Sequence, residues 1–301
     1  MSGVVGRVAG FLRERWISVL TVLVLAGAWE VAAHLVPRSP LRQSPIVPPW
    51  EFVFGPALLG MSDYWKIQMW APVPELGGAQ TYLGAFLAIT YHSAITLFRV
   101  ASGLVFGFVG GVGLGLVVSW SPFMRRLVAT PLHILRMCPL LAMVPLFQFW
   151  FGATNHSAII YVAYGVGVVY FVGTINAVAN VPQRYLESAA TLGATRLQVY
   201  RWIVLPAILP ELFSSIFLTL GLAWSAVIGA EYIGVESGIG RMIIWAEYFS
   251  HTGRMMLVTI FIVIYASLSY WLFRKIAARV LDWMPASAGR LQGANLEGIR
   301  R

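Results

Sequence analysis

Long apolar runs alternate with short polar connections along most of this chain. The runs are continuous, rich in Leu, Val, Ile, Gly and Ala, and reach the length of about 20 residues that a helix needs to cross a bilayer. Transmembrane β-strands are instead segments of about ten residues with alternating hydrophobicity, so we expect helices. The pattern predicts six spans: Trp16–Val36, Val100–Trp120, Leu127–Trp150, Ala158–Asn180, Leu212–Gly234 and Met255–Ala277.

Composition agrees with an all-α polytopic membrane protein. Hydrophobic residues make up 58% of the chain and charged residues 11%, against roughly 25% charged residues in an ordinary soluble domain. Arg7, Arg13 and Arg15 precede the first run, as in a signal peptide, and Ala26–Ala28 resembles a cleavage site. Because the run continues past that point to Val36, we interpret it as a retained anchor.

The distribution of Lys and Arg predicts the orientation, because cytoplasmic loops carry an excess of both residues. With both termini in the cytoplasm, the inner side receives most of them, whereas the outer side receives Arg38, Arg42, Lys66, Arg241 and Arg254. The net charge of +9 therefore needs no nucleic acid to explain it. The single cysteine, Cys138, lies in a predicted span and allows no intrachain disulfide.

Residues 37–78 form the least hydrophobic outer stretch, and the segment is rich in proline. We expect an ordered extracytoplasmic loop whose Trp50, Trp65 and Trp70 either lie at the lipid headgroups, where aromatic rings are favoured, or bind an external partner. The pattern over Gln80–Phe98 then predicts an amphipathic helix that enters the second span and can lie along the membrane interface.

Glycines are concentrated in the second span, with Gly107-x-x-Gly110 and Gly111-x-x-x-Gly115. Small residues let transmembrane helices approach closely. We favour tight packing within one subunit over a dimer interface.

A polar helix-turn-helix is predicted between the fourth and fifth spans. Pro182 suits a helix start, and Gly193 suits the position after a helix end. Thr195-x-x-Gln198 is a capping-box pattern that starts a second helix, predicted to end at Leu205 before Pro206. The small side chains of Ala189, Ala190, Gly193 and Ala194 leave a surface that can enter a groove on another protein.

This segment resembles the EAA loop of binding-protein-dependent ABC transporter permeases, with Ser188 where the family prefers its first Ala. Pro131-x-x-x-x-Arg136-x-x-Pro139 and its continuation to Gly152, together with Ala230-Glu231 and Gly238-Ile239-Gly240, are similar to the nitrate, sulfonate, taurine and bicarbonate branch. The resemblance runs from about Thr96 to Trp283, whereas Phe54–Gly78 is longer than the usual connection. It assigns coupling to Glu187, Ser188, Ala189, Ala190, Leu192, Gly193, Ala194, Leu205 and Pro206, followed by Pro210.

The resemblance implies the type I ABC importer fold, with six transmembrane helices and a cytoplasmic coupling helix-turn-helix. It implies a homodimer in the bacterial cytoplasmic (inner) membrane, two cytoplasmic ATPase subunits that bind ATP and Mg, and an extracytoplasmic solute-binding protein. The expected cargo is a small anion such as a taurine-like sulfonate, nitrate or a related organic acid. The expected regions are 1–36 (tail and first span), 37–95 (outer loop and amphipathic helix), 96–283 (core, with coupling loop 181–210) and 284–301 (cytoplasmic tail).

No catalytic or metal site is predicted in the chain itself. Its two lysines, Lys66 and Lys275, do not stand in a phosphate-binding glycine loop, and no zincin, paired-cysteine or Gly-x-Ser-x-Gly pattern occurs. The alternatives are a secondary transporter driven by an ion gradient, for which we find neither inverted repeats nor an acid or histidine relay, and a membrane scaffold, which would not need this loop.

Ionisable groups within spans are functional candidates by default. Arg136 is a candidate to face the pathway and favour an anion; alternatively, it binds carbonyls that Pro139 leaves free. Arg99 and Glu231 are candidates to pair as an outer gate, although Arg99 alone can reach the interface. Further pathway candidates are Gln148, Asn176, Ser225 and Tyr232.

Overall fold

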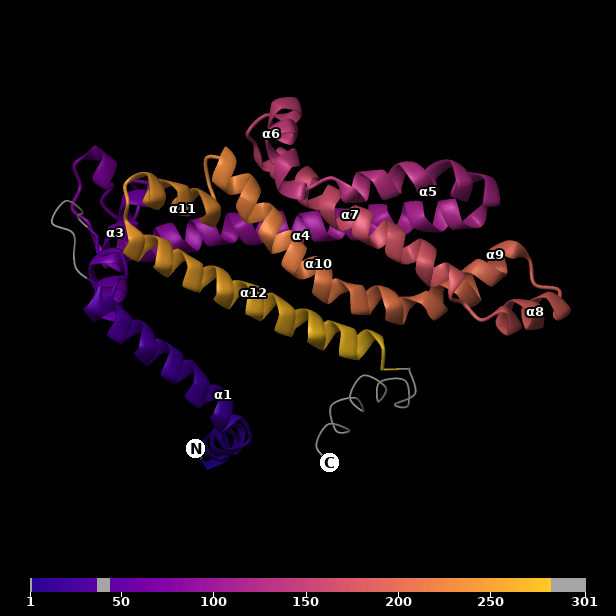
Figure 1. The fold of residues 1–301 in the computed structure, drawn as a ribbon, viewed down its shortest axis with the longest axis horizontal. Helices are drawn as coiled ribbons and strands as arrows, with labels where there is room; N and C mark the ends of the chain where they lie inside the picture. Colours follow the sequence, from indigo (N-terminus) through magenta and orange to yellow (C-terminus); the bar gives the residue numbers. More distant parts are fainter. Residues whose placement is uncertain (1, 37–43, 283–301) are drawn as a thin grey trace. The chain divides into compact units, whose positions relative to one another are not determined.

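The computed structural model describes residues 2–36 and 44–282, and every regular element in these ranges is helical (Figure 1). The long helices are α1 (Ser2–Leu35), α4 (Tyr82–Trp120), α5 (Pro122–Met137), α6 (Leu140–Phe151), α7 (Asn155–Ala179), α10 (Leu205–Ile233), α11 (Ile239–Tyr248) and α12 (Thr252–Val280). The short ones are α2 (Trp50–Phe52), η1 (Val53–Ala57), α3 (Leu58–Gly60), η2 (Met61–Tyr64), η3 (Pro74–Leu76), α8 (Gln183–Thr191), α9 (Arg196–Val199) and η4 (Tyr200–Val204).

Contacts divide the chain into two compact units. The first unit is Met1–Ser93 with Met242–Phe261, and the second unit is Ala94–Arg241 with Ile262–Arg301.

In the first unit, residues 44–80 fold into short helical turns around a small core. Val53 and Met61 are fully buried. Trp50 donates a hydrogen bond from its ring to Ala26 O of α1 (3.0 Å), and its backbone N–H donates to Glu30 (2.9 Å). These bonds anchor the start of the predicted outer loop to α1. Trp65 is also buried, whereas Trp70 is 68% exposed.

Arg254 at the start of α12 holds a second part of the first unit together. Its guanidinium pairs with Asp63 (Nη2–Oδ2, 2.8 Å) and lies over the Tyr64 ring. A Cβ at Gly60 would meet this guanidinium, at 2.6 Å from Nε, so the glycine lets the Arg254 side chain lie against the backbone there.

The second unit is organised around α7, which packs against α10, α6 and α5. Glycines at every fourth position of α4 face α7: a Cβ at Gly103 would lie 2.6 Å from Val162 Cβ, and one at Gly107 would lie 2.7 Å from Val166 Cβ. Gly111 and Gly115 continue the stripe against the same helix. The glycines therefore serve packing within one subunit, as predicted.

The prediction of one continuous helix over Leu127–Trp150 was wrong. The helix ends at Met137, and α6 begins at Leu140. Cys138 is extended (ψ 125°), because the ring of a following proline disfavours the helical conformation in the residue before it. Pro139 thus separates two helices.

The helix predicted over Gln80–Phe98 runs directly into the second span, as expected. Tyr82–Trp120 is one helix of 39 residues. Residues 98–100 contain no glycine or proline that would break a helix. The amphipathic stretch and the second span therefore form one continuous helix.

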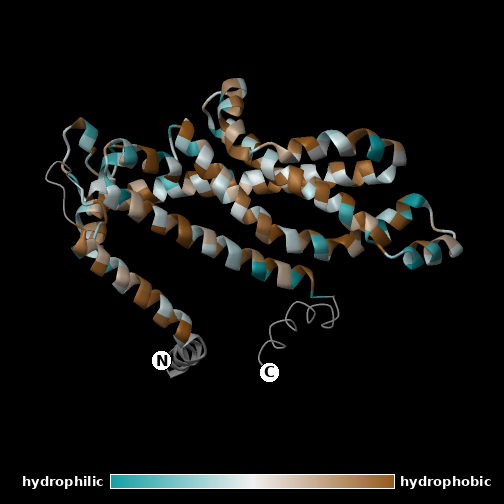
Figure 2. Cartoon of the chain, in the orientation of Figure 1, coloured by the Kyte–Doolittle hydropathy of each residue, from teal (hydrophilic) through white to brown (hydrophobic). Residues whose placement is uncertain are grey.

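The described residues contain five helical segments long and apolar enough to cross a membrane: Trp16–Leu35, Tyr82–Trp120, Asn155–Ala179, Arg196–Ile233 and Thr252–Val280. The broken pair α5 and α6 replaces the remaining predicted span. Figure 2 shows hydrophobic residues along these helices, while hydrophilic residues gather on α8 and α9. The all-α membrane class is confirmed.

Candidate functional site

Two polar features stand out in the second unit. One is the segment that comprises α8 and the turn leading to α9, which we call the α8 turn. The other is a buried ionic cluster around Glu231. The α8 turn is built from local signals. Gly193 has a left-handed backbone (φ 73°), and Gly193 N–H and Ala194 N–H donate to Ala190 O and Ala189 O, each at 3.0 Å. This pair of bonds is the Schellman motif, which satisfies the last carbonyls of a helix.

The next helix begins at a complete capping box. The Thr195 hydroxyl accepts from Gln198 N–H (3.4 Å), and the Gln198 side chain accepts from Thr195 N–H (2.8 Å). Both predicted signals, Gly193 and Thr195, are confirmed.

The predicted end of the second helix before Pro206 was wrong. A π-helical turn, η4, carries the helix on, with Leu205 N–H bonded to Tyr200 O. Proline lacks the N–H and its ring clashes with the carbonyl four residues back in an α-helix. The wider turn accommodates Pro206, so α9, η4 and α10 form one run.

A groove of about 870 Å³ opens between α8 and this run. We name it the α8 groove; it is lined by Tyr185, Ser188, Ala189, Trp202, Pro206 and Pro210, among others. The surrounding surface is open: Leu192 is 86% exposed and Trp202 is 70% exposed. Arg184 lies over the Tyr185 ring and Arg201 lies over the Trp202 ring. Each of these two aromatic rings therefore has a positively charged side chain next to it.

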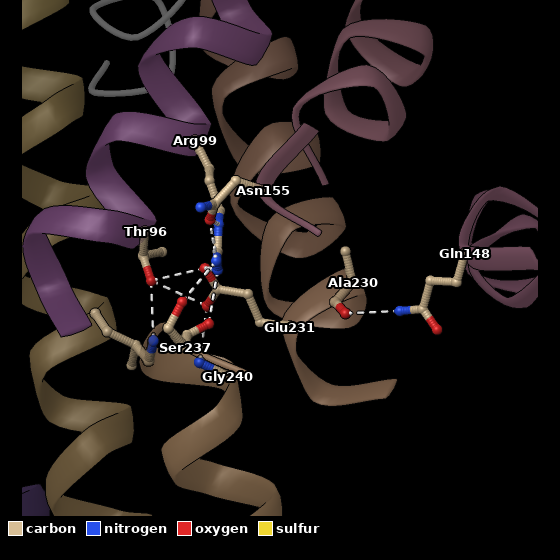
Figure 3. Close-up of polar contacts among 9 residues, drawn as sticks. Thr96, Arg99, Gln148, Asn155, Ala230, Glu231, Ser237 and Gly240 are labelled. Carbon is tan, nitrogen blue, oxygen red and sulfur yellow. Dashed lines mark hydrogen bonds and ion pairs between the residues drawn. The ribbon is translucent and has the colours of Figure 1, made fainter. Parts of the chain in front are cut away.

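The other feature is a cluster of polar side chains around Glu231, near the end of α10 (Figure 3). Glu231 and Arg99 of α4 are fully buried and form an ion pair (Oε1–Nη1, 2.6 Å). The Thr96 hydroxyl donates to both carboxylate oxygens (2.9 Å each), and Gly240 N–H donates to Oε2 (2.9 Å). The carboxylate is therefore fully hydrogen-bonded.

Arg99 is equally well satisfied. Its Nε donates to Asn155 Oδ1 (2.9 Å), and Nη2 also bonds to this oxygen. Nη1 reaches Ser237 O (2.7 Å), and Nη2 reaches Ser237 Oγ (2.8 Å). With the bond to Glu231, these match the five N–H donors of a guanidinium.

Two glycines make room for the carboxylate. Gly238 has φ 110°, and a Cβ there would overlap the Glu231 carboxyl group. A Cβ at Gly240 would lie 2.7 Å from Glu231 Cβ. The Gly238-Ile239-Gly240 motif thus lets the start of α11 close over Glu231.

The structure brings Arg99 and Glu231 together. Gln148 is partly buried and donates to Ala230 O (3.1 Å), as Figure 3 shows. Ser225 is exposed on α10 and donates to Gly221 O (2.9 Å), and Asn176 is exposed on α7. Tyr232 is partly buried. Arg136 lies in α5, but its side chain is outside the described residues.

Sequence reasoning missed Thr96, Asn155 and Ser237. One signal was available: Thr96 stands three residues before Arg99 on a helix, so both face the same side. Asn155 and Ser237 give no comparable signal, because they lie 56 and 138 residues from Arg99 in the sequence.

Residues 103–282 match the family model described as the binding-protein-dependent transport system inner membrane component. The chain belongs to this family. Its members are permease subunits of ABC importers, in which a separate subunit carries the ATPase. Family membership favours this assignment over a transporter driven by an ion gradient, and places the chain in the inner membrane as a multi-pass protein.

Relatives belong to the sulfonate, taurine and nitrate branch, as the sequence motifs indicated. The chain is 28% identical to the taurine transport system permease protein TauC of Escherichia coli (strain K12), over 90% of each chain. It is 30% identical to the nitrate import permease protein NrtB of Leptolyngbya laminosa, over 69% of this chain and 73% of that one. A chain of the MetNI methionine ABC transporter in an inward-facing conformation shares the fold, with a TM-score of 0.56 at 24% identity, over 65% of this chain and 96% of that chain.

Proposed function

We propose that two copies of this chain form the transmembrane pathway of an importer for a small oxyanion such as a sulfonate or nitrate, delivered by an extracytoplasmic binding protein. The names of the relatives support this cargo, since one is named for taurine and one for nitrate. Taurine carries a sulfonate group, and both sulfonate and nitrate spread a negative charge over several oxygens. Two ATPase subunits, which bind ATP and Mg, supply the energy.

The observation that carries this function is the α8 turn. Glu187, Ser188, Ala190, Leu192 and Gly193 are exposed on it, and Ala189 is buried beneath. A short helix whose end is fixed by a Schellman motif and a capping box projects small side chains outward without depending on a partner for its shape. We propose that this turn, continued by Ala194, Leu205 and Pro206, docks in a cleft of the ATPase and carries its closure to the membrane helices.

Ala190→Trp tests this docking, because Ala190 is exposed and a Trp there adds bulk without disturbing the backbone. We expect the ATPase that co-purifies with the wild-type chain to be lost, since blocking the centre of an interface costs about 2 kcal/mol or more, about thirtyfold in affinity. Gln183→Trp at the start of α8, also exposed and not lining the α8 groove, is the matched control. Wild-type recovery of the ATPase with Ala190→Trp would overturn the proposal.

We place the pathway along one face of α10. The exposed positions Ser214, Leu218, Gly221 and Ser225 repeat with helical spacing, and Tyr232 follows seven residues later. Ser214, Gly221 and Ser225 are small or polar, which favours a solvated path over lipid on this face, whereas Leu218 between them is apolar. Asn176 of α7 and Gln148 of α6 are the neighbouring candidates, with Arg136 of α5 as the group that favours an anion.

Arg136→Gln tests the charge. We expect uptake of the anion to fall at least about tenfold, equal to about 1.4 kcal/mol of lost interaction, with normal amounts of folded protein. Arg125→Gln, at an exposed position of the same helix, should leave uptake unchanged. Normal transport by folded Arg136→Gln would exclude this role for Arg136.

A further inference from the structure

The α8 turn and the buried cluster are connected by one unbroken helical run. Arg196–Ile233 is a continuous helical run of 38 residues that includes the π-helical turn η4. We name it the rod. It begins directly after the cap residue Thr195, and its last turn carries Glu231. A displacement of the α8 turn therefore acts on the cluster through a single helix.

The far end of the rod is held from several sides. Thr96 and Arg99 bind Glu231 from α4, and Arg99 in turn binds Asn155 at the start of α7. Gln148 of α6 donates to Ala230 O, one of the last carbonyls of α10, which have no partner within the helix. Among the described residues the near end is held by apolar packing and not by an ionic cluster: Tyr200 contacts the Trp120 ring and Val204 is buried. Arg196 is exposed, and the bonds of Thr195 are local.

The start of α11 is tied to the same point. Ile239 N–H donates to Thr96 Oγ1 and Gly240 N–H donates to Glu231, each at 2.9 Å. Glu231 thereby satisfies N–H groups at the start of α11, where a negative charge is also favoured by the helix dipole. The carboxylate joins the end of one helix to the beginning of the next.

Pulling Arg99 and Glu231 apart would cost free energy. Removing one partner of a buried, hydrogen-bonded ion pair leaves an uncompensated charge, and both side chains here have no exposed surface. A gate that opened between Arg99 and Glu231 would have to rehydrate both charges in every cycle. A rotation of the rod about the cluster needs no such loss.

We propose that the Arg99–Glu231 cluster is a permanent pivot of the transport cycle, and that the rod swings about it when the ATPase moves the α8 turn. Thr96 and Asn155 are positioning residues that fix the pivot on α4 and α7. This inference rests on the proposed docking of the α8 turn to an ATPase. It replaces the expected gate between Arg99 and Glu231 with a contact that persists in every state.

Thiol labelling in the assembled transporter distinguishes a pivot from a gate. In a Cys138→Ser background, Thr96→Cys is compared with Ser225→Cys, which lies on the exposed face of the rod. Each is treated with a water-soluble thiol reagent without nucleotide and after trapping with ATP and orthovanadate. We expect position 96 to stay protected in both states, and the labelling rate at position 225 to change at least about tenfold, as for two states with distinct exposure.

Labelling at position 96 in either state would overturn the pivot and leave the proposed function standing. An unchanged rate at position 225, together with an ATPase that does not co-purify, would overturn the proposed function and the pivot with it. Hydrogen exchange of the unmodified complex provides a second measurement that needs no variant. The Ile239 and Gly240 amides should be protected in both states, and loss of that protection in one state would contradict the pivot.

Discussion

At the residue scale, His251 lies in a setting that disfavours its charged form. Burial lowers the pKa of His251, and the positive charge of Arg254 lowers it further, while Asp63 opposes the shift. Its buried Nδ1 has no hydrogen-bond partner. A protonated ring would place a second positive charge beside the Arg254–Asp63 pair that holds the first unit together.

We therefore predict that the protein loses stability as the pH falls. The folded state binds fewer protons than the unfolded state between the lowered pKa and the ordinary value of about 6.5, so the free energy of unfolding is highest above that ordinary value and declines below it. His251→Gln should reduce the difference in melting temperature between pH 7.5 and pH 5.5. His156→Gln, at an exposed position, is the control. Equal pH dependence in wild type and His251→Gln would contradict this account.

Residues whose role is local were predictable from sequence. Gly193 and the Thr195–Gln198 box act within six residues of each other, and propensities for such motifs are strong. The partners of Glu231 were only half accessible: two charges in spans suggest each other, but Thr96 is 135 residues from Glu231. A hydroxyl in a span more often bonds its own helix, so its sequence position alone does not reveal a distant carboxylate.

At the scale of elements, α4 packs closely against α7. A Cβ at Gly111 would approach the Gly167 carbonyl carbon to 3.1 Å and Tyr170 Cβ to 2.9 Å, with the carbonyl oxygen closer still. The neighbouring Gly110 has no atom within 4 Å of such a Cβ. These adjacent glycines differ in packing alone.

Gly111→Ala should therefore force α4 and α7 apart, at a cost of about 1–3 kcal/mol. Gly110→Ala should leave stability within about 0.5 kcal/mol of wild type or raise it slightly, since alanine favours the helix. The melting temperature of each variant in detergent measures the difference. An equal effect of the two substitutions would show that the α4–α7 contact is not close-packed.

Sequence periodicity predicted most helices but not where they join or break. Apolar content alone made Leu127–Trp150 look continuous, although Pro139 inside it was a visible break signal. The opposite error occurred at Pro206. This proline does not end the helix, because the wider π-helical turn η4 before it leaves room for the proline ring. Hydropathy predicts whether a helix lies in lipid or in water. Whether a proline ends a helix depends instead on the backbone hydrogen bonds that the neighbouring residues can form.

At the scale of the whole molecule, the Lys and Arg distribution predicts that the α8 turn faces the cytoplasm and the 44–80 segment faces outward. Leu192 and Met69 test this, since they are 86% and 78% exposed. In a Cys138→Ser background, Leu192→Cys should react with a membrane-impermeant maleimide only in inside-out vesicles, and Met69→Cys only in right-side-out vesicles. Labelling of both from one side would contradict the orientation.

Transport by purified components tests the central claim most directly, namely that this chain is a passive pathway driven through its α8 turn by a separate ATPase. The chain is reconstituted in proteoliposomes with its co-purifying ATPase and its binding protein, and uptake of the labelled solute held by that binding protein is measured. We predict uptake only when ATP and Mg²⁺ are present on the ATPase side, and none with Ala190→Trp. Uptake by the chain alone, driven by an ion gradient without the ATPase, would contradict the account.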